Sequence, residues 1–96
     1  MKTAAITIDV DSIRHYRAIH GLAEHPDEED PIYTVALPRF WSLLEELQLP
    51  ATLFLIGADA SKYASAFEPV GSTGSEVASH SFAHDYRIST QSRSDI

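Results

Sequence analysis

The sequence contains no cysteine, which excludes a disulfide scaffold and a thiolate metal site. It has only two lysines, and 7 basic residues stand against 14 acidic ones, which gives a formal net charge of −7. Because phosphate groups are bound by clustered basic side chains, this balance argues against a nucleic-acid or anionic-membrane partner. No apolar run approaches the roughly 20 residues that cross a bilayer, so we expect no membrane span.

The first residues carry no recognisable export signal. A signal peptide begins with basic residues and continues with roughly 7–15 apolar ones, whereas the short apolar stretch after Lys2 already meets Asp9. Together with the lack of cysteine, this predicts a cytoplasmic location. The length of 96 residues, of which 44% are hydrophobic and 22% charged, predicts one small globular domain.

The first half of the chain predicts a strand, a long loop and a helix. Residues 3–9 are apolar, partly β-branched and end in Asp9, which is typical of a buried strand. Residues 12–33 are polar and predict a long loop with a helical turn at 13–19. A helix is expected over 35–48, because apolar residues recur there at helical spacing. These residues are Leu37, Phe40, Trp41, Leu44 and Leu47.

The second half adds two further strands. Residues 51–57 are a continuous apolar run that ends in glycine, which predicts a buried strand. Asp59 is expected to cap a short helix over 60–67, and residues 76–79 are expected to form a third strand. Residues 88–96 have the character of a helix start. Strands that alternate with helices predict an α/β fold with a parallel sheet or barrel.

Two pairs of side chains are candidates for chemistry. Asp9 and Asp11 are two residues apart, so an extended strand directs both carboxylates to one side. His80 and His84 are four apart, which places both imidazoles on one face of a helix or turn. Two imidazoles and a carboxylate make a three-ligand metal site with open positions for water. Each pair follows a predicted parallel strand, where α/β folds place their sites, although exposed strand-end acids and surface histidines would give the same spacings.

Other polar side chains lie near these pairs in the sequence. Arg14, His15 and Tyr16 follow the aspartate pair and are candidates for lining a substrate pocket. Asp85 follows the second histidine and is a candidate acceptor for an imidazole N–H, which would orient a metal-binding ring. A solvated loop is the simpler explanation of each.

Three stretches of the chain together resemble the polysaccharide deacetylases, the NodB-homology group that is also called carbohydrate esterase family 4. They are residues 6–11 (ITIDVD), 50–57 (PATLFLIG) and 74–84 (GSEVASHSFAH). The resemblance covers residues 4–96 and implies the N-terminal half of a distorted (β/α) barrel, with about three parallel strands. Because a closed barrel needs roughly 200 residues or more, we expect residues 1–96 to be a single partial domain, truncated at the C-terminus.

The resemblance implies a metal-dependent hydrolase. Asp11, His80 and His84 would bind a divalent metal, usually zinc, and Asp9 would act as the general base. The reaction would remove an acetyl or formyl group from an N-acylated sugar or a related non-peptide amide, through metal-activated water. The spaced aspartate pair differs from the adjacent pair that is commoner in the family, and it resembles members that act on smaller or lipid-linked substrates. The base-orienting arginine and the general-acid histidine belong to later family motifs, so this chain alone is expected to bind metal but to show little turnover.

Two alternatives remain open at this point. An apolar strand that ends in Asp-Val-Asp also resembles the haloacid-dehalogenase-type phosphatases, with Asp9 as nucleophile, Asp11 as acid and magnesium as metal. That resemblance gives no role to His80 and His84. The other alternative is a non-catalytic metal-binding or structural fragment, which would self-associate through the open edges of an incomplete sheet.

Overall fold

The computed structural model of the chain describes residues 2–23 and 29–85, which contain one parallel sheet. Strands β1 (Thr7–Val10), β2 (Thr52–Leu55) and β3 (Glu76–Ser79) lie side by side in that order. Strands alternate with helices, which confirms the predicted α/β class and the three parallel strands of a partial barrel. The helices of the described residues are α1 (Ile13–Ile19), the π-helical turn η1 (Ile32–Ala36), α2 (Leu37–Leu47), α3 (Gly57–Lys62) and the 3₁₀ helix η2 (Ala64–Val70).

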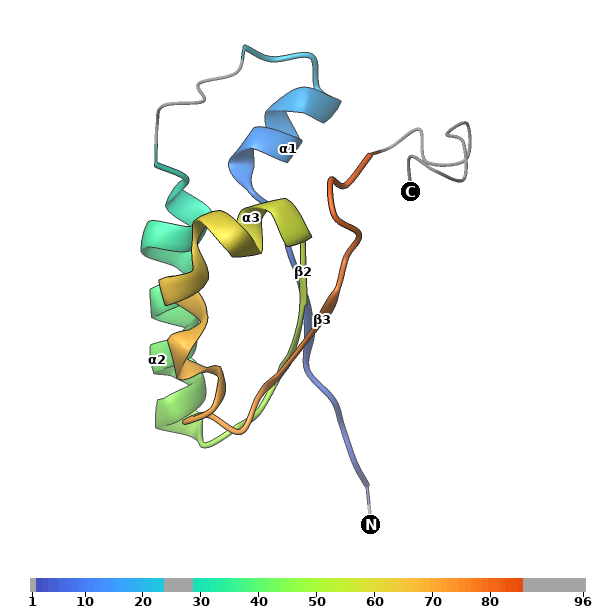
Figure 1. The fold of residues 1–96 in the computed structure, drawn as a ribbon. Coiled ribbons are helices and arrows are strands. Elements are labelled where there is room, and N and C mark those ends of the chain that lie inside the picture. The colour runs from blue at the N-terminus through green and yellow to red at the C-terminus, as the bar shows by residue number, and fades with distance from the viewer. Residues whose placement is uncertain (1, 24–28, 86–96) are drawn as a thin grey trace.

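The helices cover one face of the sheet. In Figure 1, α2 and the segment that contains η2 run along the same side of the three strands. Val10 and Leu53 point to that side and are buried there. Because successive side chains of a strand point to opposite faces, Asp9, Phe54 and Ala78, which are level in the register, share the other face. No helix of the described residues lies over that face (Figure 1).

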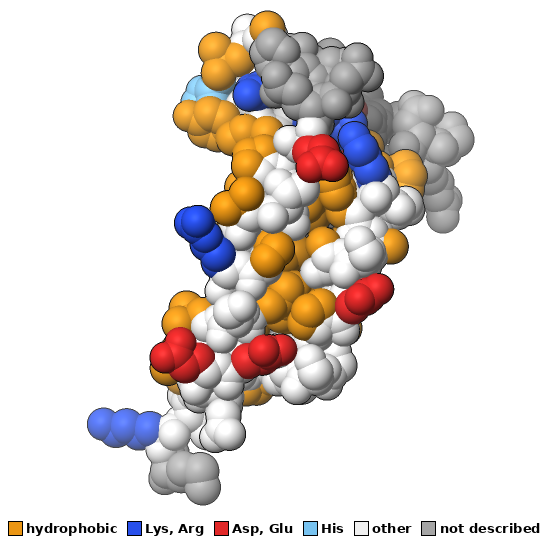
Figure 2. Space-filling model, turned by 90° about the vertical axis from the view of Figure 1, so that its left-hand side faces the viewer, with side chains coloured by type: hydrophobic (Ala, Val, Ile, Leu, Met, Phe, Trp, Pro, Cys, Tyr) orange, Lys and Arg blue, Asp and Glu red, His pale blue; other side chains and the backbone are white. Residues whose placement is uncertain are grey.

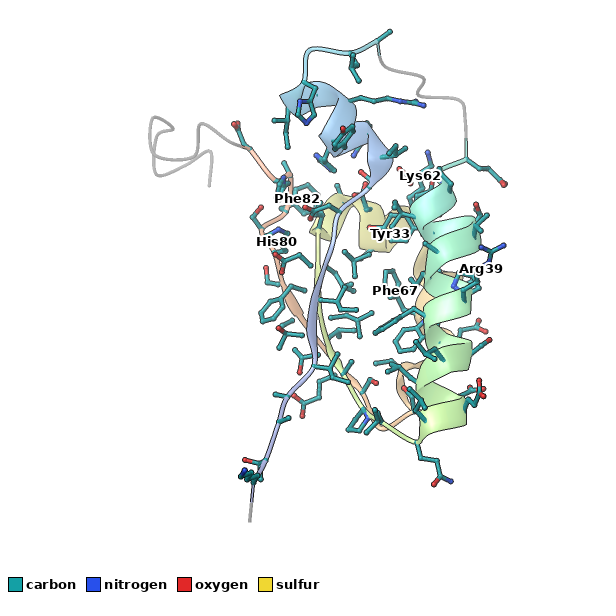
Figure 3. All side chains as sticks on the ribbon, turned by 180° about the vertical axis from the view of Figure 1, so that it is seen from behind. Tyr33, Arg39, Lys62, Phe67, His80 and Phe82 are labelled. Atoms are coloured by element: carbon teal, nitrogen blue, oxygen red, sulfur yellow. The ribbon has the colours of Figure 1, made fainter. Side chains whose placement is uncertain are left out.

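The core lies between the sheet and α2. Leu53 of the central strand is 0% exposed, and Trp41 of α2 belongs to the same buried cluster. The indole of Trp41 donates its N–H to the carbonyl oxygen of Ala66 in η2, at 2.8 Å. Tyr33 and Phe67 point into the same layer (Figure 3). Burial of these apolar side chains therefore fixes β2 and α2 relative to each other.

The outer side of the helix layer is partly apolar. Figure 2 shows hydrophobic side chains down the middle of this side, with acidic side chains beside them. A groove of about 260 Å³ between α2 and η2 is lined by Trp41, Pro69 and Glu45, among others. In the part of the chain that the structure describes, no helix is long and apolar enough to cross a membrane.

The helix predicted over 35–48 begins earlier than expected. The carboxylate of Asp30 accepts the backbone N–H of Ile32 at 3.0 Å, so helical structure starts with η1 and continues directly into α2. It ends at Gln48, whose φ of 54° is left-handed and stops the helix before Pro50. The helical turn predicted at 13–19 is confirmed as α1.

The segment after β2 differs most from the prediction. Asp59 does not cap a helix over 60–67, since α3 begins at Gly57 and the side chain of Asp59 lies buried in its first turn. The remainder of that range belongs to η2. The first two strands are shorter than predicted, while the third has the predicted bounds. The helix start predicted at 88–96 lies outside the described residues.

We expect Leu53→Ala to lower the free energy of unfolding by about 3 kcal/mol, because it leaves a cavity in the central strand. Urea denaturation followed by circular dichroism measures this loss. Leu43→Ala is the control, since Leu43 lies on α2 with 49% of its surface exposed and its loss should cost less than about 1 kcal/mol. Equal losses in the two variants would contradict the assigned core.

Candidate metal centre

The parallel register brings two candidate ligands to the same edge of the sheet. Val10, Leu55 and Ser79 are level with one another at the carboxyl ends of the three strands. Asp11 and His80 directly follow β1 and β3, so both leave the sheet at this edge. The backbone N–H of His80 donates to the carbonyl of Leu55 at 2.8 Å, which extends the β2–β3 pairing by one residue. In Figure 3, His80 lies at this end of the sheet, close to Phe82.

Three ligand atoms converge there. Nε2 of His80 lies 3.0 Å from Nε2 of His84 and 3.2 Å from Oδ1 of Asp11, and Nε2 of His84 lies 3.8 Å from the same oxygen. In a tetrahedral zinc site with ligands at about 2.0–2.1 Å, neighbouring ligand atoms are about 3.3–3.4 Å apart. Oδ1 of Asp11 is shielded from solvent and accepts no hydrogen bond from the described residues. The three atoms therefore fit a small divalent cation.

The cluster is open on one side. The side chains of Asp11 and His80 are 42% and 29% exposed, whereas that of His84 is 13% exposed. A metal ion held by these three groups would keep positions for water or substrate on the exposed side, as catalytic metal sites do.

A strained turn carries the two histidines. Ser81 and His84 have φ values of 63° and 52°, in the left-handed region that non-glycine residues seldom adopt. The backbone N–H of His84 donates to Oγ of Ser81 at 3.0 Å, which closes the turn. Conformations of this kind persist only where surrounding contacts enforce them.

The beginning of α3 supplies those contacts. The backbone N–H groups of Gly57 and Ala58 donate to the carbonyl oxygens of Ser81 and Phe82, at 3.0 and 2.9 Å. The first N–H groups of a helix have no partner within the helix, so these bonds satisfy α3 and anchor the histidine turn together. The close approach requires glycine, because a Cβ at Gly57 would lie 2.8 Å from the ring of Phe82.

A buried charge lies behind the histidines. Asp59 is 4% exposed, its Oδ1 accepts a hydrogen bond from Nη2 of Arg14 at 3.0 Å, and its Oδ2 lies 3.3 Å from Nε2 of His15. The ring of His15 meets the ring of His84 edge-on, with centroids 5.4 Å apart. Burial lowers the pKa of His15, with Arg14 and His84 acting in the same direction and Asp59 opposing them. These contacts of Asp59 could not be predicted from the sequence, because an aspartate near the start of a helix is typical of a cap.

The other sequence-predicted residues lie around this centre. Asp9 is exposed on β1 and does not belong to the ligand cluster. Tyr16 is 52% exposed and packs against His20. Asp85 is half-buried directly after the histidine turn.

Two cavities flank α1. One of about 300 Å³ is lined by charged side chains that include Arg14, Lys62 and Asp59. The other, of about 210 Å³, is mostly apolar and is lined by Asp11, Tyr16 and isoleucines of α1 and η1. Each cavity is therefore lined by one of the residues that the sequence suggested for substrate binding, Arg14 in the charged cavity and Tyr16 in the apolar one.

An open parallel sheet with an aspartate and two histidines at its carboxyl edge defines an α/β protein whose candidate site lies where parallel sheets and barrels place theirs. The family model described as polysaccharide deacetylase matches residues 27–96, more than two thirds of the chain. The chain therefore belongs to the polysaccharide deacetylase family, whose members are deacetylase-type hydrolases. Comparisons with curated proteins and with solved structures give no match.

The family match includes only part of the centre. His80 and His84 lie inside the matched range, whereas Asp9 and Asp11 precede it. The case for Asp11 as a ligand thus rests on its distance to the two imidazoles. No such distance joins Asp9 to the cluster, and its role stays a prediction.

We expect Gly57→Ala to weaken metal binding about tenfold, the lower end for changes around a metal's ligands, because the new methyl group displaces Phe82 and the histidine turn. Titration with zinc as the probe measures the affinity. The control is Gly71→Ala, since a Cβ there meets nothing within 4 Å and the backbone φ of −69° suits alanine. Unchanged affinity in Gly57→Ala would show that this close approach does not shape the site.

Proposed function

We propose that the chain carries the metal-binding part of a hydrolase that removes an acetyl or formyl group from the nitrogen of an N-acylated sugar or a related small amide. The observation that supports this most is the convergence of Asp11, His80 and His84 in a chain of the polysaccharide deacetylase family. We treat residues 1–96 as a single partial domain of this kind. The cytoplasmic location and the self-association through sheet edges expected from the sequence stay predictions.

The donor set favours zinc as the metal. Two imidazole nitrogens and one carboxylate oxygen are ligands that zinc accepts readily, and magnesium prefers oxygen. A bound zinc ion would supply Lewis acidity, which polarises an acyl carbonyl and lowers the pKa of water beside it. Asp11, His80 and His84 would hold the ion on the exposed edge of the sheet.

We assign Asp9 the role of general base. It lies on β1 two residues before Asp11, which follows the strand, so the two Cα atoms are about 7 Å apart if the chain stays extended. Its carboxylate is exposed on the face of the sheet that no described helix covers. A carboxylate there can accept a proton from water that attacks the acyl carbon.

The cavities beside α1 support substrate-binding roles for its first residues. Tyr16 lines the apolar cavity that reaches Asp11, and Arg14 lines the charged one. We therefore retain Arg14 and Tyr16 as proposed substrate-binding residues. His15 is buried and lines neither cavity, so its substrate-binding role stays a prediction from the sequence, as does that of Asp85 as an acceptor for a histidine N–H. The phosphatase alternative gains no support, because it gives no role to the two histidines that lie beside Asp11.

Zinc titration of the purified chain tests the proposal. We expect one zinc ion per chain, with binding lost in His80→Ala, which removes a ligand atom, and strongly weakened in Asp11→Asn, which removes the negative charge of a ligand. Asp9→Asn should keep the zinc ion, since Asp9 is assigned to proton transfer. His20→Ala is the matched histidine control, because His20 is exposed and contacts Tyr16.

Other outcomes would contradict specific parts of the proposal. A folded wild-type chain that binds no zinc, or a His80→Ala variant that binds it normally, would remove the metal centre. Zinc loss in Asp9→Asn with retention in Asp11→Asn would exchange the roles of the two aspartates. Appreciable release of acetate or formate from N-acylated sugars by the zinc-loaded protein, lost in Asp9→Asn, would support the reaction itself and would overturn the expectation that residues 1–96 alone show little turnover.

A further inference from the structure

Helix α1 carries apolar side chains that the core does not use. Ile13, Tyr16 and Ile19 recur at intervals of three residues, so they are neighbours along the surface of the helix. None of the three belongs to the core cluster of the described residues. Tyr16 and Ile19 are 52% and 51% exposed. Their apolar surface is therefore available for a contact outside the core.

These side chains line a cavity that reaches the candidate metal centre. The apolar cavity of about 210 Å³ is bounded by Ile13, Tyr16 and Ile19 of α1, by Ile32 of η1 and by Asp11. Asp11 is also the carboxylate of the metal cluster. Helix α1 lies beyond the carboxyl edge of the sheet (Figure 1), so a group in this cavity would lie beside the proposed reaction centre.

The lining of the cavity is suited to a hydrocarbon group. Asp11 is the charged residue of the lining, and the hydroxyl of Ser12 already accepts the backbone N–H of His15 at 3.4 Å. An apolar protein cavity of about 150 Å³ is large enough to bind benzene. A cavity of about 210 Å³ therefore has room for a group of about six carbons.

An acetyl or formyl group does not fill this space, because it contributes only one or two carbons. We propose that the substrate carries an apolar group of about six carbons next to the amide, and that this group occupies the cavity between α1 and η1 while the amide lies beside Asp11. The assignment of the cavity to the substrate rests on the function proposed above. It makes Tyr16 and Ile19 specificity-determining residues.

The apolar group can belong to either side of the amide. On the amine side it makes the sugar or other amine amphipathic, and on the carbonyl side it makes the acyl chain longer than acetyl. Three small amides separate these sources. N-Hexylacetamide extends the amine side, N-methylhexanamide extends the acyl side, and N-methylacetamide is the short reference for both.

We expect at least one of the two extended amides to bind about tenfold more tightly than N-methylacetamide. Burial of each methylene contributes about a factor of four, and ordering of the chain offsets part of that gain. Titrations of the metal-free and the zinc-loaded protein, followed in ¹H–¹³C spectra of the isoleucine methyl groups, measure affinity and location together. The signals of Ile13, Ile19 and Ile32 should shift, because these residues line the cavity. The extended amide that binds more tightly identifies the side of the amide that carries the apolar group.

Ile19→Gln tests whether this cavity provides the affinity. The variant places polar atoms in the lining, so the gain from the longer chain should fall to about twofold. Leu43→Gln is the matched control, since Leu43 is a similarly exposed aliphatic residue on α2 that does not line the cavity. Zinc affinity should be the same in both variants, because neither residue belongs to the metal cluster.

Several outcomes would overturn the proposal. They are equal affinities for the three amides, a gain that Ile19→Gln retains, and shifts confined to Ile6, which lines a separate apolar cavity next to the start of β2. Isoleucine signals that change when the ligand-free protein is diluted would show a second copy of the chain in the cavity and would also overturn it. If the chain binds no zinc, the proposed function fails, and the substrate role of the cavity fails with it. Normal zinc binding without a preference for a longer amide rejects the apolar group alone.

Discussion

The parallel pairing of β1, β2 and β3 is the constraint on which the candidate site depends. The strands end at the same level, so residues that are remote in sequence, Asp11 and His80, leave the sheet at one edge. A shift of one residue in either pairing would turn the side chains of a strand to the opposite face. The buried side chains Val10 and Leu53 specify this register, because only one alternation places them under the helices. The alternation of side chains along the paired strands therefore determines both which residues form the core and which candidate ligands leave the sheet together.

The position of His84, the second candidate histidine ligand, depends on the turn that follows β3. The turn after β3 bends back through left-handed backbone at Ser81 and His84, a conformation that costs on the order of 1 kcal/mol or more at each residue. Bonds from the first N–H groups of α3 to this turn offset that cost, and they form because Gly57 has no side chain to keep Phe82 away. The start of α3 thus acts as a support for the histidine turn.

Elements with a periodic sequence pattern could be predicted from the sequence, whereas contacts between residues that are remote in sequence could not. The helical spacing around Trp41 and the apolar runs predicted α2 and the strands, and the class of fold followed from their alternation. His80 and His84 could be recognised as a candidate metal-binding pair because the two residues are close in sequence. Asp59 was misread as a cap, since nothing local indicates that Arg14 and His15, more than forty residues earlier, will meet it. The early start of the helix at η1 was missed for the same reason, because the acceptor Asp30 lies in what reads as loop.

The ion pair of Arg14 and Asp59 is difficult to explain by stability alone. Removing the carboxylate of Asp59 from water costs on the order of several kcal/mol, and Arg14, whose side chain is 48% exposed, can offset only part of that cost. A small domain with a limited core has little reason to retain such a pair for folding. The pair does bring a buried negative charge to the ring of His15, since Oδ2 of Asp59 lies 3.3 Å from its Nε2. The ring of His15 meets the ring of His84 edge-on, so this charge lies close to the candidate ligand whose backbone is strained.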